Sequence, residues 1–524
     1  MKKTGYRLIV VIFLITIILF SCFILFGCSS QKDRQDTAIP TTPPHFDYGY
    51  YAEEAVNLVY VYPEIYSDAP DKERVIEALN QMTKEKINVT VTMESYPHAT
   101  ITSKINSKIA DNQQMDLFRS HRMLASLAAR NAIAPLDNLL MQYGRDLLAQ
   151  ENYNFMKFND VTYGIACSAA DFGYYCLLIN AKMAKEFGVE EMIKKVKRFE
   201  DMEDIYKIVH QKNPYIKCYI PSGYNNSAFQ GYSITDGIET ISHLGDGLGV
   251  ILNNDNRNIV NFYETPEYKK LLEISRNFYL KGYFPPSAAF TDVNRDVQYQ
   301  SEEGFSVMNH HWALKRDAPY LVSGNEFFGI DSWVIPLSTL FIDSRMLGIS
   351  ISASSKYKEA AMAWLNLVST DKETYQLLSY GIEGEHYIKN DNGTIRLPEG
   401  CDSIADTGYE TSHYFLMGDS RNRLVWDTIS DDPNYYDKLM EYNNDIIFSN
   451  TLGFVYDDHM VADEVDACKK VVQKYTMALE SGALDPETEL PKFIAELKDV
   501  GIDTIIREKQ RQLDHWLKTK EMRK

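Results

Sequence analysis

One stretch of the chain combines strand-like and helix-like hydrophobic patterns. The β-rich runs 58–62, 89–93 and 115–118 predict three short strands. Between them, residues 72–86 carry apolar side chains at spacings of four and three, and residues 101–109 also favour a helix. The order strand, helix, strand, helix, strand is typical of a parallel sheet with right-handed crossovers. The pattern therefore predicts an α/β fold.

Candidate binding residues follow from this predicted sheet. Ligands of parallel sheets bind beyond the carboxyl ends of the strands. Asp116, Arg119 and His121 lie in or just after the third predicted strand, so all three are candidates. The alternative is that Asp116 caps the following helix and that Arg119 is solvated.

The C-terminal part predicts amphipathic helices. An apolar residue recurs every three or four positions between 461 and 479, and residues 502–516 carry a second such face. We expect both stripes to be buried against the body of the protein rather than to form docking surfaces. Their members are Val461, Val465, Cys468, Val472, Tyr475, Leu479, Ile502, Ile505, Leu513 and Trp516.

The N-terminus has the pattern of a secretory signal. Three basic residues among the first seven precede an apolar run over residues 8–26, and the sequence Leu-Phe-Gly-Cys ends at Cys28. This ending resembles a bacterial lipobox, which implies that residues 1–27 are removed and that Cys28 carries a lipid. The alternative is an uncleaved anchor, because the apolar run is 19 residues long and a helix of roughly 20 residues spans a bilayer. Both interpretations place the bulk of the chain outside the membrane.

Residues 28–54 predict a flexible tether. Positions 31–45 are polar and rich in Thr and Pro, with nothing to bury. A coil of this length spans roughly 30 Å. It would hold the body just clear of a membrane surface.

Length and composition limit the class of protein. The 524 residues suffice for several domains, and 45% hydrophobic with 24% charged residues is typical of a globular chain. Lys and Arg total 54 against 73 Asp and Glu, which gives a net charge of −19. So acidic a chain repels phosphate backbones, and this excludes nucleic acid as a partner.

We find no catalytic or metal-binding motif in the sequence. The H-E-x-x-H, G-x-S-x-G and Walker patterns are absent, and residues 253–258 lack the glycine and glutamate of a calcium loop. Two of the seven cysteines lie in the signal region, and no C-x-x-C or zinc spacing occurs. Cys167 and Cys176 could form a disulfide; the alternative is that the cysteines are buried thiols. We expect no enzyme activity, no metal and no cofactor.

Several segments resemble, in order, the extracellular solute-binding proteins of ABC importers (family 1-like). The match is to the carbohydrate-associated group with lipid-anchored receptors, in a long branch. The best-matching stretch is 357–387, which ends Tyr-Gly-Ile-Glu-Gly-Glu-His-Tyr. The other matching segments are 131–137, 161–165, 177–189, 268–282 and 452–456, and together they span most of residues 55–524.

The resemblance implies a periplasmic-binding-protein-like fold of type II, in which two α/β lobes joined by hinge strands close around a ligand. It implies lobe 1 at 55–172 plus 346–384, lobe 2 at 173–345 plus 385–450, and a packed helical region at 451–524. The crossings between the lobes are expected near 171–175, 345–348 and 383–387.

A cleft that binds sugar needs aromatic faces for the apolar C–H surface and polar planar groups for the hydroxyls. Trp312 resembles the family's ligand-stacking aromatic residue; the alternative is a core tryptophan. The preceding His310 and His311 face opposite sides of a predicted strand, so they cannot share one metal. The remaining candidates are Tyr174 and Tyr175 at the first hinge, Tyr224, Asn225 and Asn226 in a polar loop, Trp333 in a second strand, and Glu383 in the last hinge.

The expected function is that of a monomeric, membrane-tethered receptor on the extracytoplasmic face. It would capture a carbohydrate, in particular an oligosaccharide, and deliver it to an ABC permease without breaking a bond. One alternative is a receptor of the same fold for peptides or another non-sugar solute, because fold does not fix ligand. The other is a lipid-anchored glycoside hydrolase. With 73 acidic residues, a carboxylate pair at the spacing of a glycosidase is expected in almost any fold, so such a pair by itself would prove little.

Overall fold

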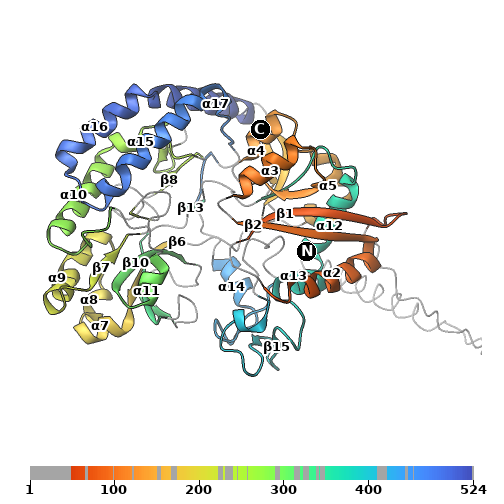
Figure 1. The fold of residues 1–524 in the computed structure, drawn as a ribbon, viewed down its shortest axis with the longest axis horizontal. Coiled ribbons are helices and arrows are strands. Elements are labelled where there is room, and N and C mark those ends of the chain that lie inside the picture. Colours follow the sequence, from red (N-terminus) through yellow and green to blue (C-terminus); the bar gives the residue numbers. More distant parts are fainter. Residues whose placement is uncertain are drawn as a thin grey trace, which may run out of the picture. The chain divides into compact units, whose positions relative to one another are not determined.

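The structure is a computed structural model, and Figure 1 shows its ribbon. It describes residues 49–64, 69–97, 100–120, 123–149, 155–166, 174–221, 228–229, 240–244, 246–255, 258–289, 295–311, 319–322, 330–337, 341–342, 348–409, 422–442, 447–451 and 454–521. The predicted signal peptide, Cys28 and most of the predicted tether lie outside these ranges.

A six-stranded mixed sheet forms the first lobe. Its strand order is β2-β1-β3-β14-β5-β4, with β1 parallel to β2 and β3, and β14 antiparallel to β3 and β5. The strands are β1 (Val56–Glu64), β2 (Val89–Pro97), β3 (Leu117–Arg119), β4 (Phe155–Phe158), β5 (Val161–Ala166) and β14 (Gly348–Ile351). The helices of this lobe are α2 (Lys72–Ile87), α3 (Ile101–Ala110), α4 (Leu124–Ala129), α5 (Asp137–Tyr143), α6 (Arg145–Ala149), α12 (Lys358–Thr370) and α13 (Lys372–Tyr380).

Helix α2 illustrates why these residues adopt this order. Its buried positions Val75, Leu79, Thr83 and Ile87 recur every four residues, so they form one face that packs on the lobe. The helix ends at Asn88, whose N–H still donates to the Lys84 carbonyl and whose left-handed φ of 56° turns the chain out of the helix. Strand β2 begins at the next residue. The predicted succession of three strands and two helices is thereby confirmed.

A five-stranded sheet forms the second lobe. Its order is β11-β12-β6-β10-β7, with β6 antiparallel to both β10 and β12, and β7 parallel to β10. The strands are β6 (Tyr174–Asn180), β7 (Lys217–Ile220), β10 (Gly304–His311), β11 (Tyr320–Val322) and β12 (Ser332–Pro336). The helices are α7 (Ala181–Phe187), α8 (Glu190–Ile193), α9 (Glu203–Lys212), α10 (Pro266–Leu280) and α11 (Arg295–Gln300), with the 3₁₀-helix η3 (Phe199–Met202).

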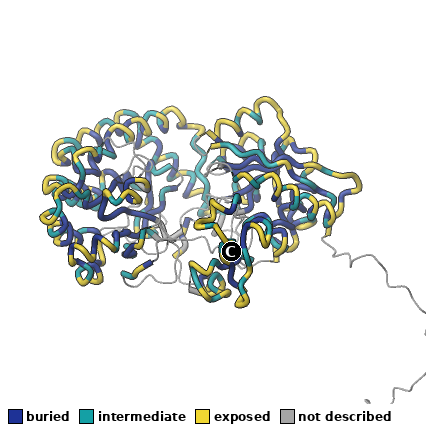
Figure 2. The backbone as a smooth tube through the Cα atoms, turned by 60° about the horizontal axis from the view of Figure 1, so that its bottom comes forward, coloured by how far each residue is buried: buried dark blue, intermediate teal, exposed yellow. Residues whose placement is uncertain are grey.

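Aromatic rings fill the core of the second lobe. The ring centroid of Phe199 lies 5.2 Å from that of Tyr219, 5.4 Å from Phe229 and 5.6 Å from Phe278. Edge and tilted contacts of this kind suit the ring quadrupoles. Figure 2 shows the buried residues in dark blue toward the inside of the molecule, with the exposed residues in yellow around them.

The C-terminal helices pack on the second lobe. Helices α15 (Ala462–Glu480), α16 (Pro486–Asp499) and α17 (Ile502–Glu521) share one hydrophobic cluster with α10 and with residues 241–263. Val465, Cys468, Tyr475 and Leu479 are buried in it, so the predicted stripe is core. Residues 241–264 contribute β8 (Ile241–Ser242), β9 (Ile251–Leu252) and η5 (Phe262–Glu264), and η10 (His459–Val461) precedes α15.

The described residues between 385 and 442 contact the first lobe, whereas the resemblance implies the second lobe for residues 385–450. The Tyr380 hydroxyl donates to the Leu424 carbonyl at 2.9 Å, and the Tyr409 hydroxyl donates to the Leu378 carbonyl at 2.7 Å. Its elements are β15 (Ile388–Lys389), β16 (Ile395–Arg396), η6 (Ala405–Thr407) and α14 (Tyr435–Tyr442); further on, β17 (Ile447–Phe448) pairs with β13 (Phe341–Ile342). The local sequence around Tyr380 and Tyr409 gives no indication that their hydroxyls bind these distant carbonyls.

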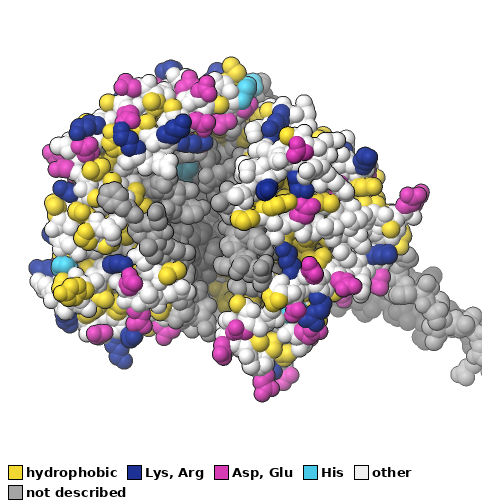
Figure 3. All heavy atoms as spheres, viewed as in Figure 1, with side chains coloured by type: hydrophobic (Ala, Val, Ile, Leu, Met, Phe, Trp, Pro, Cys, Tyr) yellow, Lys and Arg dark blue, Asp and Glu magenta, His cyan; other side chains and the backbone are white. Residues whose placement is uncertain are grey.

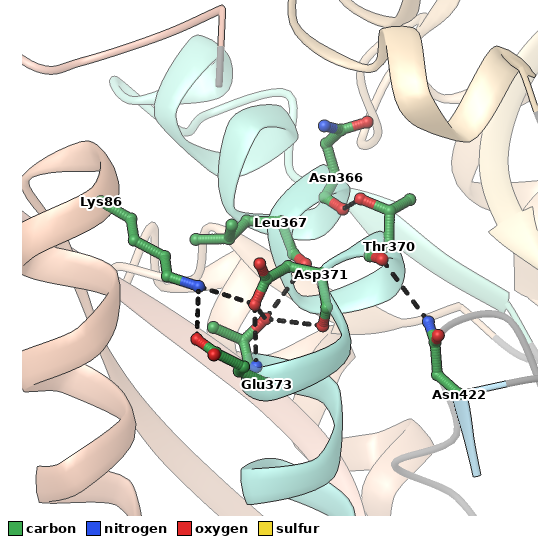
Figure 4. A network of polar contacts seen from close by, with 8 residues as sticks. Lys86, Asn366, Leu367, Thr370, Asp371, Glu373 and Asn422 are labelled. Carbon is green, nitrogen blue, oxygen red and sulfur yellow. Dashed lines mark hydrogen bonds and ion pairs between the residues drawn. The ribbon is translucent and has the colours of Figure 1, made fainter. Parts of the chain in front are cut away.

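A polar network lies where α2, the end of α12 and the start of α13 meet residue 422 (Figure 4). The Lys86 ammonium of α2 reaches the Asp371 carboxylate at 2.8 Å and the Glu373 carboxylate at 3.4 Å. Asp371 also caps α13 by accepting the Thr374 N–H, and Asn422 donates to the Thr370 carbonyl. The network therefore joins α2, α12, α13 and residue 422.

Three cysteines of the described part are buried: Cys176, Cys218 and Cys468. Burial raises the pKa of Cys218 to about 12 and that of Cys468 to about 11. They therefore pack as small hydrophobic side chains. Cys167 lies outside the described residues, so the disulfide with Cys176 stays a prediction. Among the helices that the structure describes, none is both long and apolar enough to cross a bilayer.

Candidate functional site

One edge of the second sheet gathers several of the predicted binding residues. In the register between β10 and β6, His310 pairs with Tyr175 and His311 pairs with Tyr174. Strand β7 runs parallel to β10, so both strands direct their carboxyl ends toward this edge. Edges of this kind are where α/β sheets bind ligands.

Two predicted groups lie in segments that continue from this edge. Trp312 directly follows the end of β10, and Tyr224, Asn225 and Asn226 follow Pro221 at the end of β7. These four residues lie outside the described residues, as does His121. Only the strands that precede them are placed by the register, so these residues stay predicted members of the site.

The corresponding edge of the first sheet is formed by the ends of β3 and β5. Arg119 pairs with Ile349, and Ala166 pairs with Gly348, so β14 lies between the two carboxyl ends. Arg119 is buried, with 3% of its surface exposed. A guanidinium at such an edge can donate in a planar fork to hydroxyl or carboxylate oxygens.

The chain passes directly from one edge to the other. Residues 167–173 connect the end of β5 with the start of β6, and an extended segment of this length spans at most about 29 Å. Residues 343–347 return the chain to β14. Most of the two expected crossings near 171–175 and 345–348 lies outside the described residues, so both crossings stay predictions. Together the two edges form the candidate site.

The segment 381–387 joins the first lobe through the start of α2. The His386 Nδ1 accepts the Ile382 N–H at 2.7 Å, so its Nε2 carries the hydrogen toward the Asp71 carboxylate at 3.2 Å. Arg74 of α2 forms ion pairs with Asp71 and Glu385. Hydrogen bonding from His386, reinforced by Arg74, lowers the pKa of Asp71 below its ordinary value.

Glu383 lies within this segment, which we had expected to form a third crossing. Its carboxylate is half exposed and pairs with the Lys389 ammonium at 2.5 Å, while the backbone of Glu383 bridges to Tyr387. Since α2 starts where the chain returns from the carboxyl end of β1, the segment lies near the same edge as Arg119. The sequence analysis missed the pair of Asp71 and His386, although His386 stands in the matched string Tyr-Gly-Ile-Glu-Gly-Glu-His-Tyr.

Asp116 belongs to the framework rather than to the site. It precedes β3 and so lies at the opposite end of that strand from Arg119. Its carboxylate accepts from the Val59 N–H and the Gln114 amide, each at 2.9 Å, and from the Ser355 hydroxyl at 2.5 Å. The alternative prediction, that Asp116 caps the following helix, is wrong. The carboxylate instead links β1 to the turn after β14.

Trp333 also lies away from the candidate site. It pairs with Ile179, near the far end of β6 from Tyr174, and 6% of its surface is exposed. Its ring packs in the core of the second lobe, beneath the Lys194 ammonium at 5.8 Å from the ring centroid. We therefore leave Trp333 out of the proposed site.

The charges of the described residues give no sign of a metal or nucleic-acid site. No three His, Cys, Asp or Glu side chains in the described ranges are grouped to hold a metal ion. On the face in Figure 3, acidic and basic side chains are interspersed among the described residues without a basic stripe.

Comparisons with known proteins agree with this two-lobe arrangement. Residues 76–382 match the family described as bacterial extracellular solute-binding protein, and residues 450–518 match a domain of unknown function. A carbohydrate ABC transporter substrate-binding protein of Streptococcus pneumoniae serotype 4 is 23% identical over 480 residues, which cover 86% of this chain and 90% of the relative.

Solved structures share the fold. An N-glycan transport solute-binding protein from Streptococcus pneumoniae superposes with a TM-score of 0.74 at 20% identity, over 89% of this chain and 100% of that chain. An extracellular solute-binding protein from Bifidobacterium longum subsp. infantis gives a TM-score of 0.59 at 14% identity, over 89% and 99%. The match to the bacterial extracellular solute-binding protein family covers residues 76–382, which is more than half of the chain. The chain therefore belongs to this family.

Proposed function

We propose that this protein is the substrate-binding component of an ABC importer and that it captures an oligosaccharide between its two lobes. The observation that carries the proposal is the strand register, which brings Tyr174, Tyr175 and the strand leading to Trp312 to one sheet edge. The relative at 23% identity is a carbohydrate ABC transporter substrate-binding protein. Solved relatives hold Man1GlcNAc and Man5GlcNAc.

The chemistry of this edge suits a sugar. Aromatic rings cover the C–H faces of a pyranose, because burying apolar area is favourable and ring faces attract C–H edges. Arg119 and Glu383, at the edge of the other sheet, offer a donor fork and a two-oxygen acceptor for hydroxyl groups. The ligand is held without cleavage, stabilises the closed arrangement of the lobes by its preference for that state, and passes to the permease.

A thermal-shift screen tests the proposal. The body from residue 31 to 524 is heated with Man5GlcNAc, with fructo-nystose, with monosaccharides and with short peptides. A ligand that binds only the folded state raises the melting temperature by mass action, by several degrees in large excess. A shift with a glycan that is recovered intact is the expected result. A shift with peptides alone would favour a peptide receptor, and a cleaved glycan would favour a glycoside hydrolase.

Trp312 provides a sharper test of the site. We expect Trp312→Ala to weaken glycan binding more than about tenfold, because one stacked ring contributes over about 1.4 kcal/mol. The melting temperature of the ligand-free protein should stay nearly unchanged.

Trp333→Phe is the matched control for Trp312. Trp333 lies in the core, so this change should lower the melting temperature and leave glycan affinity intact. A large loss of stability in Trp312→Ala would instead make Trp312 a core residue.

Attachment to the outer face of the membrane is the second part of the proposal. It rests on the sequence ending at Cys28 and on membership of an extracellular family. Cys28→Ala should release the protein from membranes on fractionation, since a lipid on that cysteine is the anchor. Continued retention of the variant would favour an uncleaved N-terminal helix. We propose that the protein acts there as a monomer.

A further inference from the structure

The segment 381–387 folds around one histidine side chain. His386 is buried, with 1% of its surface exposed. Its Nδ1 accepts the Ile382 N–H at 2.7 Å, and its own backbone N–H donates to the Ile382 carbonyl at 2.9 Å. The Gly384 N–H donates to the Tyr387 carbonyl at 2.8 Å. Residues 382–387 therefore form a compact turn, and the imidazole supplies one of its hydrogen bonds.

Gly381 shows how closely this turn fits the ring. It follows the last residue of α13 and has a positive φ of 77°, which favours glycine. A Cβ at this position would overlap the His386 Nδ1 and would lie 2.8 Å from the Tyr409 ring. Both the backbone conformation and the lack of space therefore require glycine here, since the imidazole occupies the room that a side chain would need.

The turn is fixed to the first residues of α2. The His386 Nε2 donates to the Asp71 carboxylate at 3.2 Å, and Arg74 forms ion pairs with Asp71 and Glu385. Each ring nitrogen of His386 thus has a hydrogen-bond partner, which fixes both the tautomer and the orientation of the ring. The turn cannot move relative to α2 without losing one of these contacts.

Glu383 is the residue of this turn that the proposed function assigns to the ligand. Its side chain is half exposed, and the Lys389 ammonium contacts one carboxylate oxygen, Oε2. The bridge between Glu383 and Tyr387 makes its backbone part of the turn. A binding group has to be held within about 0.5 Å of its productive position by the residues behind it. Whatever fixes the turn therefore also fixes Glu383.

We propose that His386 is a positioning residue for ligand binding. It holds the turn 382–387, and with it the Glu383 carboxylate, in place at the edge of the first sheet. The inference rests on the proposed function, because Glu383 contacts a ligand only if the two sheet edges bind the glycan. It gives a buried histidine an effect on affinity that is separate from its contribution to stability.

Three variants distinguish positioning from general stability. His386→Leu removes both side-chain hydrogen bonds at similar volume. His386→Asn is the conservative variant, because its amide oxygen takes the position of Nδ1 and can accept the Ile382 N–H. Lys86→Met is the matched control, since Lys86 pairs with Asp371 at 2.8 Å and so joins α2 and α13 at their other ends. Lys86 lies roughly 20 Å along α2 from Asp71.

The first readout is the affinity for Man5GlcNAc, or for fructo-nystose if Man5GlcNAc does not bind, by calorimetry. We expect His386→Leu to weaken binding about tenfold, and His386→Asn and Lys86→Met to stay within about threefold of the wild type. Wild-type affinity in His386→Leu would overturn the inference. So would an equal loss in Lys86→Met, because the effect would then follow stability alone.

A double-mutant cycle tests whether His386 acts through Glu383. We expect Glu383→Ala to weaken binding about tenfold, and His386→Leu to add less than about twofold in that background. A further loss of about tenfold would overturn the positioning role, since the two side chains would then act independently. Wild-type affinity in Glu383→Ala would overturn it as well, although glycan binding by the wild type would leave the proposed function standing.

The last readout needs no ligand and therefore separates this inference from the proposed function. Hydrogen exchange of the peptide 382–389 should become about tenfold faster in His386→Leu and stay unchanged in Lys86→Met. Unchanged exchange in His386→Leu would overturn the inference even if the wild type binds glycan. If exchange responds as expected while the wild type binds no glycan, the proposed function fails and the support of the turn stands.

A second variant covers the case that His386→Leu does not fold. His386→Gln then takes its place, because its amide group reaches the position of Nε2 and leaves the Ile382 N–H without its acceptor. The same tenfold losses of affinity and of protection from exchange are expected, and wild-type values of both would overturn the inference.

Discussion

Several buried charged residues in this protein have partners that are remote in the sequence. Asp116 accepts from Ser355, 239 residues away, and Lys509 pairs with Asp246, 263 residues away. Burial of a charge is tolerated when such partners satisfy it. Local sequence gives no sign of these partners, which is why Asp116 looked like a binding residue and why Lys509 was not singled out.

Glu508 on α17 gives a prediction for pH dependence. Hydrogen bonds from Arg511 and Gln512 lower the pKa of Glu508 to about 2. Its pKa is therefore lower in the folded than in the unfolded protein, where it is about 4.3. The resulting stabilisation is present above about pH 4.3 and is lost as the pH falls toward 2.

Glu508→Gln should remove this component. The free energy of unfolding, from urea titrations at pH 6 and pH 3, should fall less between the two pH values in the variant than in the wild type. The difference is about 1 kcal/mol at most, because Arg511 lies largely in solvent. Equal pH dependence of the two proteins would show that this carboxylate does not stabilise α17.

The candidate site could be predicted in part at the level of single residues. Tyr174 and Tyr175 were predicted because they adjoin an expected hinge, and Arg119 because it lies at the end of a predicted parallel strand. The structure places the backbone of these residues at the two sheet edges. Trp333 was predicted as a binding residue but lies in the core. Nothing in the local sequence distinguishes a tryptophan on a fully buried strand from one at the end of a strand. Burial of both sheet faces removes the alternation that would tell these apart.

Among the elements, the last helix depends on one buried ion pair. Lys509 is fully buried, its ammonium contacts the Asp246 carboxylate and donates to the Leu248 carbonyl at 2.7 Å, and it lies 4.7 Å from the Tyr456 ring centroid. Burial lowers the pKa of Lys509, while Asp246 opposes that effect. The pair joins α17 to the loop before β9.

Lys509→Met should destabilise the protein by about 3–5 kcal/mol, because it leaves the Asp246 carboxylate in the interior without its cation. The double variant Asp246→Asn with Lys509→Met should recover a large part of that loss. Denaturant unfolding of the two single variants and the double variant measures the coupling. Additive losses in the double variant would mean that the two side chains stabilise the fold independently.

Element boundaries were predictable where the pattern is local. Helix α2 and the strands β1 and β2 lie within a few residues of their predicted limits, because their apolar spacing alone decides them. The segment after α13 was assigned to the other lobe, because hydroxyls such as those of Tyr380 and Tyr409, which bind distant carbonyls, decide its location.

At the level of the whole molecule, the C-terminal helices complete the core of the second lobe. Phe262, Tyr268 and Leu272 are buried in the same cluster as residues of α15, α16 and α17. A chain that ends at residue 449 would expose these side chains to water. Their burial contributes about 1.5–3 kcal/mol each.

We therefore expect the 48–449 fragment to lose cooperative unfolding and to bind a hydrophobic dye, whereas the 48–524 chain does neither. Near-ultraviolet circular dichroism and dye fluorescence measure both properties. A 449-terminated fragment with a cooperative transition would show that the second lobe folds without these helices.

The position of β14 in the first sheet has a consequence for the order of folding. All five strands of the second sheet lie between residues 174 and 336, whereas β14, which pairs with both β3 and β5, begins only at Gly348. The lobe that is synthesised first therefore waits about 180 residues after β5 for its central strand, or about 10–40 s at ordinary rates of synthesis. During that interval β3 and β5 each lack a neighbour, so the first sheet closes last although its synthesis begins first.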